Sequence, residues 1–157
     1  MNNLYINLPY HDSSFEVKSN DDGLLNAIGI YYKPFVQNKS NNQKIFTIEA
    51  RLSDCQVTVS YLNNKSIYSY DDVLQTIHNI LYSNAQLSSE VIALHAASVG
   101  YKGKAYIFIG STMAGKTTLT AYLTGNGFDY ITDDVAIINR NSKLLMPYPK
   151  AMHLRRD

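Results

Sequence analysis

The sequence predicts an α/β domain that follows a smaller α+β unit. Residues 46–52 alternate between apolar and polar side chains, as in a half-buried strand, and residues 73–81 carry apolar side chains at helical spacing. Further on, a glycine-rich loop at 110–118 joins a strand-like run to a helix-like run. The character of the chain changes near SNAQLSSE, so we expect an α+β unit over 1–88 and an α/β domain over 89–157.

The composition is typical of a folded globular chain. Hydrophobic residues make up 45% of the 157 residues and charged residues 17%. The net charge of +1 argues against nucleic-acid binding, which needs a clustered basic face. The one such cluster is formed by Lys150, His153, Arg155 and Arg156.

No feature of the sequence targets it to a membrane. The start, MNNLYINLPYHDSS, lacks the basic and apolar regions of a signal peptide, and no apolar run approaches the roughly 20 residues that span a bilayer. The single cysteine, Cys55, lies in a strand-like run and has no disulfide partner in the chain. We therefore expect a cytoplasmic protein.

The first unit is expected to contain a hairpin and a helix. VTVSYL (57–62) is predicted to pair with SIYSY (66–70) across a turn at 63–65, and QNKSNNQK (37–44) reads as a polar loop. Ser69 is a candidate cap for the helix that follows, whose apolar stripe predicts packing against a sheet. His78 lies off this stripe, so we expect it to be exposed.

In the second unit, VIALHAASV (91–99) and KAYIFIG (104–110) are predicted to form a hairpin of two buried strands. The helix after the glycine-rich loop has Leu119, Tyr122 and Leu123 on one face, and Gly125 and Gly127 should end it. YITDDVAII (130–138) is predicted to be a further strand, followed by a turn at 139–143.

The loop GSTMAGKTT carries the strongest functional signal. It satisfies G-x-x-x-x-G-K-[ST] between a strand and a helix, the context in which this pattern binds nucleotide phosphates. Its glycines let backbone N–H groups point at phosphate oxygens, and the helix adds its N-terminal dipole. Lys116 would reach the β and γ phosphates of ATP, and the Thr117 hydroxyl would bind Mg²⁺. The predicted nucleotide-binding residues are Gly110, Ser111, Thr112, Met113, Ala114, Gly115, Lys116, Thr117 and Thr118.

Asp133 and Asp134 are candidates for the chemical step. A carboxylate at the end of a strand beside a phosphate loop suits metal binding or proton abstraction from an acceptor hydroxyl. Neighbouring strand residues point to opposite faces, so the two can share a site only if the strand ends there. One would then orient the metal while the other acts as base. The alternative, a solvated turn, is disfavoured by the apolar residues on both sides.

His95 lies in the apolar run LHAAS, where a lone histidine is usually a core residue. However, the run HAASVGYKGKAYIFIGSTMAGKTTLTAYLTGNGFDYITDDVAII, followed by PYPKAMHLR, resembles the HPr kinase/phosphorylase superfamily. It is most similar to the HPr kinase-like proteins of peptide-modification gene clusters. The shared features, in order, are the His-Ala-Ala strand, glycine turn, second strand, phosphate loop, helix, Gly-x-x-Tyr-x-x-Asp-Asp and Pro-x-Pro. The resemblance covers residues 94–155.

This resemblance implies a P-loop kinase domain of HPr kinase type that transfers phosphate from ATP to a serine hydroxyl of a protein or peptide. Lys116 and Thr117 would hold phosphate and Mg²⁺, and the pair Asp133–Asp134 would supply a metal contact, from Asp134, and the general base. His95 would lie near the phosphates. The implied catalytic residues are therefore Asp133, Asp134, His95 and Lys116.

The family continues beyond the point at which this sequence ends, so the resemblance implies a domain incomplete at its C-terminus. An uncovered sheet edge exposes unpaired backbone groups and apolar surface. We therefore expect a completing partner chain, self-association, or a product that is only part of the ancestral enzyme. One alternative function is an inactive nucleotide-binding module that binds ATP without transferring phosphate. Another is a small-metabolite P-loop kinase, although such enzymes place the loop near their N-terminus.

Overall fold

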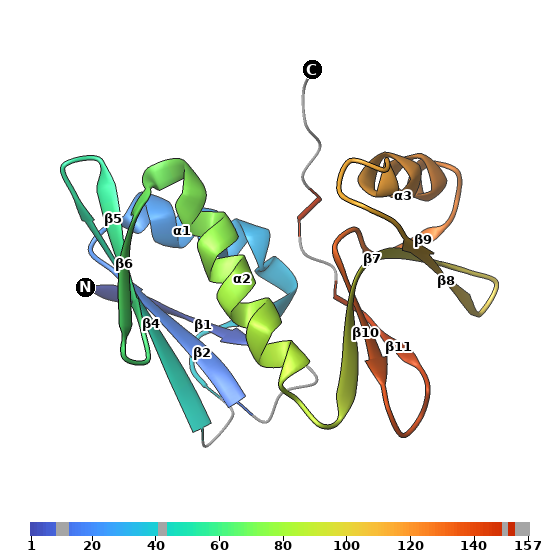
Figure 1. Ribbon diagram of the computed structural model, residues 1–157, viewed down its shortest axis with the longest axis horizontal. Coiled ribbons are helices and arrows are strands. Elements are labelled where there is room, and N and C mark those ends of the chain that lie inside the picture. The colour runs from blue at the N-terminus through green and yellow to red at the C-terminus, as the bar shows by residue number, and fades with distance from the viewer. Residues whose placement is uncertain (9–12, 41–43, 149–150, 153–157) are drawn as a thin grey trace. The chain divides into compact units, whose positions relative to one another are not determined.

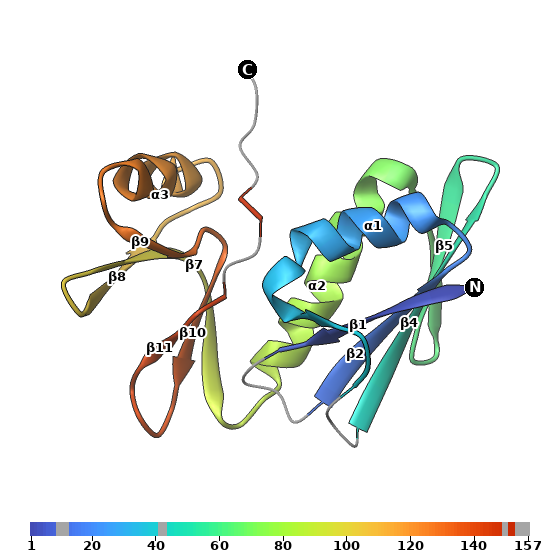
Figure 2. The same cartoon turned by 180° about the vertical axis from the view of Figure 1, so that it is seen from behind.

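A computed structural model describes residues 1–8, 13–40, 44–148 and 151–152 of the chain. The described residues form a mixed α/β structure with two sheets and three α-helices, which confirms the predicted class at this level. The chain divides into two compact units, Met1–Asn84 and Ala85–Asp157, and each unit contains one of the sheets (Figures 1 and 2).

The first unit is a six-stranded sheet with two α-helices, α1 (Asp22–Tyr31) and α2 (Val73–Gln86), on the same face (Figures 1 and 2). The strand order is β3-β1-β2-β4-β5-β6, and β2 and β4 form its parallel pair. Two single turns of 3-10 helix, Lys33–Phe35 and Tyr70–Asp72, precede β3 and α2. The strands are β1 (Asn2–Asn7), β2 (Ser13–Ser19), β3 (Val36–Gln37), β4 (Lys44–Ser53), β5 (Gln56–Tyr61) and β6 (Asn64–Ser69).

The predicted alternation places the core of this unit correctly. Ile48 and Ala50 of β4 are fully buried, and the polar residues that alternate with them, Thr47, Glu49 and Arg51, are not. On α2, Val73, Ile77 and Leu81 are fully buried, as the helical stripe predicts. The sheet and helix therefore bury the faces that the sequence pattern indicates.

Two expectations for single residues of this unit were wrong. His78 is buried, with 3% of its surface exposed, because the hydroxyl of Tyr32 at the end of α1 gives its ring Nδ1 a hydrogen-bond partner at 3.0 Å. Cys55 does not lie in a strand. It is exposed in the turn between β4 and β5, with a φ of +65°.

The predicted hairpin and helix start are shifted by a few residues. The β5–β6 turn falls at Leu62 and Asn63, where Leu62 takes a φ of +52°, while Asn64 and Lys65 already belong to β6. Ser69 precedes the 3-10 turn and makes no cap to the backbone. Its hydroxyl donates to the Asp72 carboxylate instead. Residues 41–43 of the predicted polar loop lie outside the described residues, and its ends belong to β3 and β4.

The second unit has one sheet of order β11-β10-β7-β8, and β9 also pairs with β7. All of its described pairs are antiparallel, and the predicted β7–β8 hairpin is present. The helix α3 (Lys116–Gly125) lies against β7 and β9. The strands are β7 (Val91–Tyr101), β8 (Lys104–Ile109), β9 (Asp129–Thr132), β10 (Val135–Asn139) and β11 (Leu145–Met146).

The end of α3 agrees with the glycine prediction in detail. The N–H of Phe128 bonds to the carbonyl of Leu123, and the N–H of Gly127 bonds to the carbonyl of Thr124. These two bonds form a Schellman motif, with Gly127 in the left-handed conformation at a φ of +88°.

Two strand predictions need correction. Residues 130–138 form two strands rather than one, because the ladder breaks at Asp133 and Asp134. β8 is not buried: within the described residues it is an edge strand, and Ile109 is 77% exposed. Its nearly continuous apolar sequence is typical of a strand buried on both faces of a sheet. Among the described residues, no helix is long and apolar enough to cross a membrane.

Candidate functional site

Both glycines of the predicted phosphate loop occupy positions where a side chain would be strained or crowded. Gly115 is the residue before α3 and adopts a φ of +81°, a conformation that strains any residue with a side chain. A Cβ on Gly110 would lie 3.2 Å from the Cβ of Ala114, which is tighter than ordinary contact. The loop therefore closes on itself in a way that depends on both positions.

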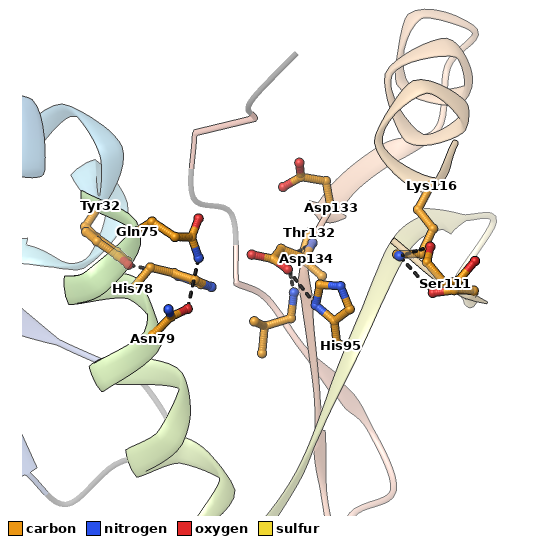
Figure 3. Close-up of polar contacts among 12 residues, drawn as sticks. Tyr32, Gln75, His78, Asn79, His95, Ser111, Lys116, Thr132, Asp133 and Asp134 are labelled. Carbon is orange, nitrogen blue, oxygen red and sulfur yellow. Dashed lines mark hydrogen bonds and ion pairs between the residues drawn. The ribbon is translucent and has the colours of Figure 1, made fainter. Parts of the chain in front are cut away.

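The side chain of Lys116 folds back into this loop. Its Nζ donates hydrogen bonds to the carbonyl oxygens of Gly110, at 2.9 Å, and Ser111, at 3.0 Å (Figure 3). The loop therefore holds a partly buried ammonium group at its centre. These two carbonyls are neutral acceptors, so an anionic phosphate would compete with them effectively for the same donor.

The start of α3 offers further donors next to this lysine. Gly115 has no side chain to cap the helix, and the N–H groups of the first helical turn have no acceptor within the helix. Thr117 is half-buried in that turn. Met113, which departs from the small residues usual in such loops, is exposed, so its side chain does not fill the loop. Together these features supply the positive charge and the N–H donors that a bound anion would need.

The acidic pair occupies the break between β9 and β10. The hydroxyl of Thr132 accepts the N–H groups of Asp134, at 3.4 Å, and Val135, at 3.3 Å, and so fixes the bend. The carbonyl of Asp134 accepts the N–H of Ala96 from β7, at 2.9 Å. The strand ends where the two aspartates begin, which is the condition under which both could serve one site.

The two carboxylates have different surroundings. Asp133 is only 5% exposed, and its Oδ1 accepts a hydrogen bond from the hydroxyl of Tyr130 at 2.9 Å. The alternative of a solvated turn is therefore wrong for Asp133. Asp134 is more open, and its Oδ1 lies 2.8 Å from Nδ1 of His95.

His95 is not a core residue, because 52% of its side chain is exposed. Its partner Asp134 orients the ring, and the two form an acid–imidazole pair at the surface of the second unit (Figure 3). The sequence pattern missed Tyr130 and Thr132. A threonine directly before two aspartates is a recognisable signal for a side chain that caps the following N–H groups.

The structure thus forms two groups from the predicted residues. His95 and Asp134 form a pair at the β9–β10 bend, where Asp133 is the adjacent residue, and Lys116 lies within the loop with Ser111 (Figure 3). Of the PYPKAMHLR segment and the basic cluster, residues 149–150 and 153–157 lie outside the described residues.

Within the described part of the chain, no group of three or more His, Cys, Asp or Glu side chains could hold a metal ion unaided. Magnesium at a nucleotide site takes most of its ligands from phosphate and water, and needs only one or two groups from the protein. The Thr117 hydroxyl and the Asp134 carboxylate suit that role, since both are oxygen ligands.

No protein-family model matches the chain, and no curated protein or solved structure matches it either.

Proposed function

We propose that this chain binds ATP with Mg²⁺ and transfers the γ-phosphoryl group to a serine hydroxyl of a protein or peptide, as HPr kinase-like proteins do. One observation carries the proposal. The ammonium group of Lys116 lies inside a loop that closes on a left-handed Gly115, directly before an uncapped helix start. A positive charge and free N–H groups at one point are what a triphosphate requires.

The loop would act by positioning and charge. Lys116 would exchange the carbonyls of Gly110 and Ser111 for β and γ phosphate oxygens, and the first N–H groups of α3 would bind the same phosphates. Mg²⁺, held by Thr117 and Asp134, would neutralise part of the phosphate charge. Phosphoryl transfer depends mostly on such positioning and neutralisation.

Asp133 and Asp134 form an acidic bend between β9 and β10, and this acidic bend would accept the proton of the serine hydroxyl. As the serine oxygen bonds to the γ phosphorus and the bond from phosphorus to the ADP oxygen breaks, the hydroxyl proton would pass to the Asp133 carboxylate. His95 would keep Asp134 oriented, since the pair already makes a 2.8 Å contact. Activity would thus need Asp133 and Asp134 in different roles.

The first test is titration calorimetry of ATP–magnesium binding to the 157-residue chain. Lys116→Ala should abolish measurable binding, while Lys104→Ala, a lysine at the opposite end of β8, should leave it unchanged. On the same samples, mass spectrometry would detect phosphate added to candidate serine peptides. Binding that does not depend on Lys116 would refute the proposed phosphate site.

A second candidate function is ATP binding without transfer. The low exposure of Asp133 and its bond to Tyr130 favour it, since a base must reach the acceptor hydroxyl. Lysine-dependent ATP binding with no phosphate on any serine peptide would support this function over the kinase. Phosphorylation of a serine peptide by the isolated chain would exclude it.

A further inference from the structure

The second sheet ends in an unpaired strand edge. β8 pairs with β7 on one side, and among the described residues no strand pairs with its other side (Figure 1). Lys102 and Gly103 form the hairpin turn with φ values of +49° and +74°, a two-residue turn whose flanking residues, Tyr101 and Lys104, bond to each other. Hydrogen-bonded pairs alternate along an antiparallel ladder, so every second residue of β8 points its N–H and C=O groups to the free side. These residues are Ala105, Ile107 and Ile109.

The other hairpin of the chain has an edge strand that is protected, and β8 lacks this protection. β6 is the edge strand of the first sheet and follows a two-residue turn, as β8 does. By the same alternation, its outward residues are Lys65, Ile67 and Ser69. A lysine on an edge strand opposes pairing with another chain. The three matching residues of β8 are all apolar, and Ile109 is 77% exposed.

The β8 edge is complementary in size to a second copy of itself. In an antiparallel pair of β8 strands centred on Ile107, Ala105 of each copy lies opposite Ile109 of the other. A small exposed side chain therefore meets a large exposed one. On the other face, Tyr106, which is 43% exposed, lies opposite Phe108, and aromatic pairs across strands are favourable.

The charges at this edge select the antiparallel direction. Lys102 and Lys104 lie at one end of β8, and residues 101–110 contain no acidic side chain. A parallel pair would place the basic ends of the two copies side by side, and like charges directly opposite are destabilising. An antiparallel pair places them at opposite ends of the interface. The second copy thus meets the requirements of both size and charge.

We propose that β8 pairs antiparallel with β8 of a second copy of this chain, centred on Ile107, so that the second sheets of the two copies become one continuous sheet. The contact is symmetric about a two-fold axis, as in most homodimers. Pairing of one short strand buries less surface than a standard stable interface, so the dimer forms only at raised protein concentration. The proposal concerns a strand edge outside the phosphate loop and stands independently of the proposed function.

The first test compares two proline variants by sedimentation velocity over a series of protein concentrations. The wild-type chain should show a monomer–dimer equilibrium. Ile107→Pro removes an outward N–H and no bond to β7, a position at which edge strands tolerate proline, and should weaken dimerisation at least about tenfold. The matched control is Ile67→Pro, at the same position of β6, which should leave dimerisation unchanged. A wild type that stays monomeric throughout, or equal effects of the two prolines, would overturn the proposal.

A charge exchange tests the register. In the double variant Ala105→Lys/Ile109→Lys, like charges face one another across the proposed pair, and the same holds for Ala105→Glu/Ile109→Glu. Each variant alone should be monomeric at concentrations where the wild type is dimeric. A mixture of the two should form heterodimers, because opposite charges then face one another. Both positions are exposed, so the fold should tolerate the changes. A mixture that stays monomeric would overturn the proposed pairing even if the wild type dimerises.

Discussion

The side chains of His95 and Asp134 meet at 2.8 Å because the strands β7 and β10 pair in one particular register. His95 lies opposite Val135 at the end of this antiparallel ladder, and the chain bends at Asp134, so strand alternation no longer directs the Asp134 side chain to the opposite face. The N–H of Ala96 also bonds to the Asp134 carbonyl. The backbone therefore holds both partners, and the contact is a property of the fold rather than of two flexible side chains.

We expect Asp134→Asn to reduce phosphoryl transfer by about 10² to 10⁴-fold, the usual range for a lost catalytic group. His95→Gln should reduce phosphoryl transfer by a smaller factor, because His95 acts through Asp134. If the two residues work as a unit, the double variant should be no slower than Asp134→Asn alone. Rates would be measured at saturating ATP–magnesium by mass spectrometry of a phosphorylated peptide. If the reductions in rate of the two single variants multiply in the double variant, His95 acts independently of Asp134.

Asp133→Asn tests the role of the base. Transfer should fall by a similar factor while ATP binding, followed by calorimetry, changes only a few-fold, because a base contacts the acceptor and not the phosphates. The matched control is Asp129→Asn, an exposed aspartate in the same strand region. Full activity of both Asp133→Asn and Asp134→Asn would mean that the acidic bend plays no part in catalysis.

Gly115→Ala should weaken ATP binding at least about tenfold and destabilise the chain by about 1–2 kcal/mol, because a φ of +81° is strained for alanine. Gly125→Ala provides the control. That glycine is the last residue of α3, and a Cβ added there would meet open space, so alanine should preserve binding and raise stability by up to about 1 kcal/mol. Urea unfolding and calorimetry measure both effects. Unchanged binding by Gly115→Ala would mean that the loop conformation is irrelevant to the ligand.

The sequence predicted those features that depend on local pattern. The alternation at Ile48 and Ala50, the helical stripe on α2 and the glycine that ends α3 all follow from short-range spacing. The burial of His78 could not be predicted, because its partner Tyr32 lies far away in the sequence, directly after α1. Nor could the exposure of β8, since its apolar sequence carries no information about how many neighbours the strand has. The strand break at Asp133 follows from a side-chain bond by Thr132, which periodicity does not detect.

Tyr32→Phe should destabilise the first unit by about 1–3 kcal/mol, because it removes the hydroxyl that bonds to His78 in a buried site. Thermal unfolding followed by circular dichroism would show the loss as a lower midpoint. Tyr122→Phe is the matched control, since that hydroxyl lies on the exposed surface of α3. A loss no larger than that of the control would show that the Tyr32–His78 hydrogen bond contributes nothing to stability.

Stability should also depend on pH through Glu16. Burial alone raises the pKa of this carboxyl, but hydrogen bonds from Asn3, Lys18 and Tyr5 together outweigh that effect and leave the pKa below its ordinary value of 4.5. The ionised form is therefore favoured in the folded chain. Its contribution is fully present above about pH 4.5 and is lost as the pH falls through the lower folded-state pKa.

Glu16→Gln should consequently be less stable than the wild type at neutral pH, and the difference should shrink steadily as the solution is acidified below about pH 4.5. Urea unfolding midpoints of both proteins, measured from about pH 7 to about pH 3, would follow that difference across the transition. Glu49→Gln removes the more exposed ion pair with Arg51 and should change the midpoint little throughout, because surface ion pairs contribute little. A Glu16→Gln difference that stays constant or grows in acid would mean that the hydrogen bonds from Asn3, Lys18 and Tyr5 do not favour the ionised carboxylate.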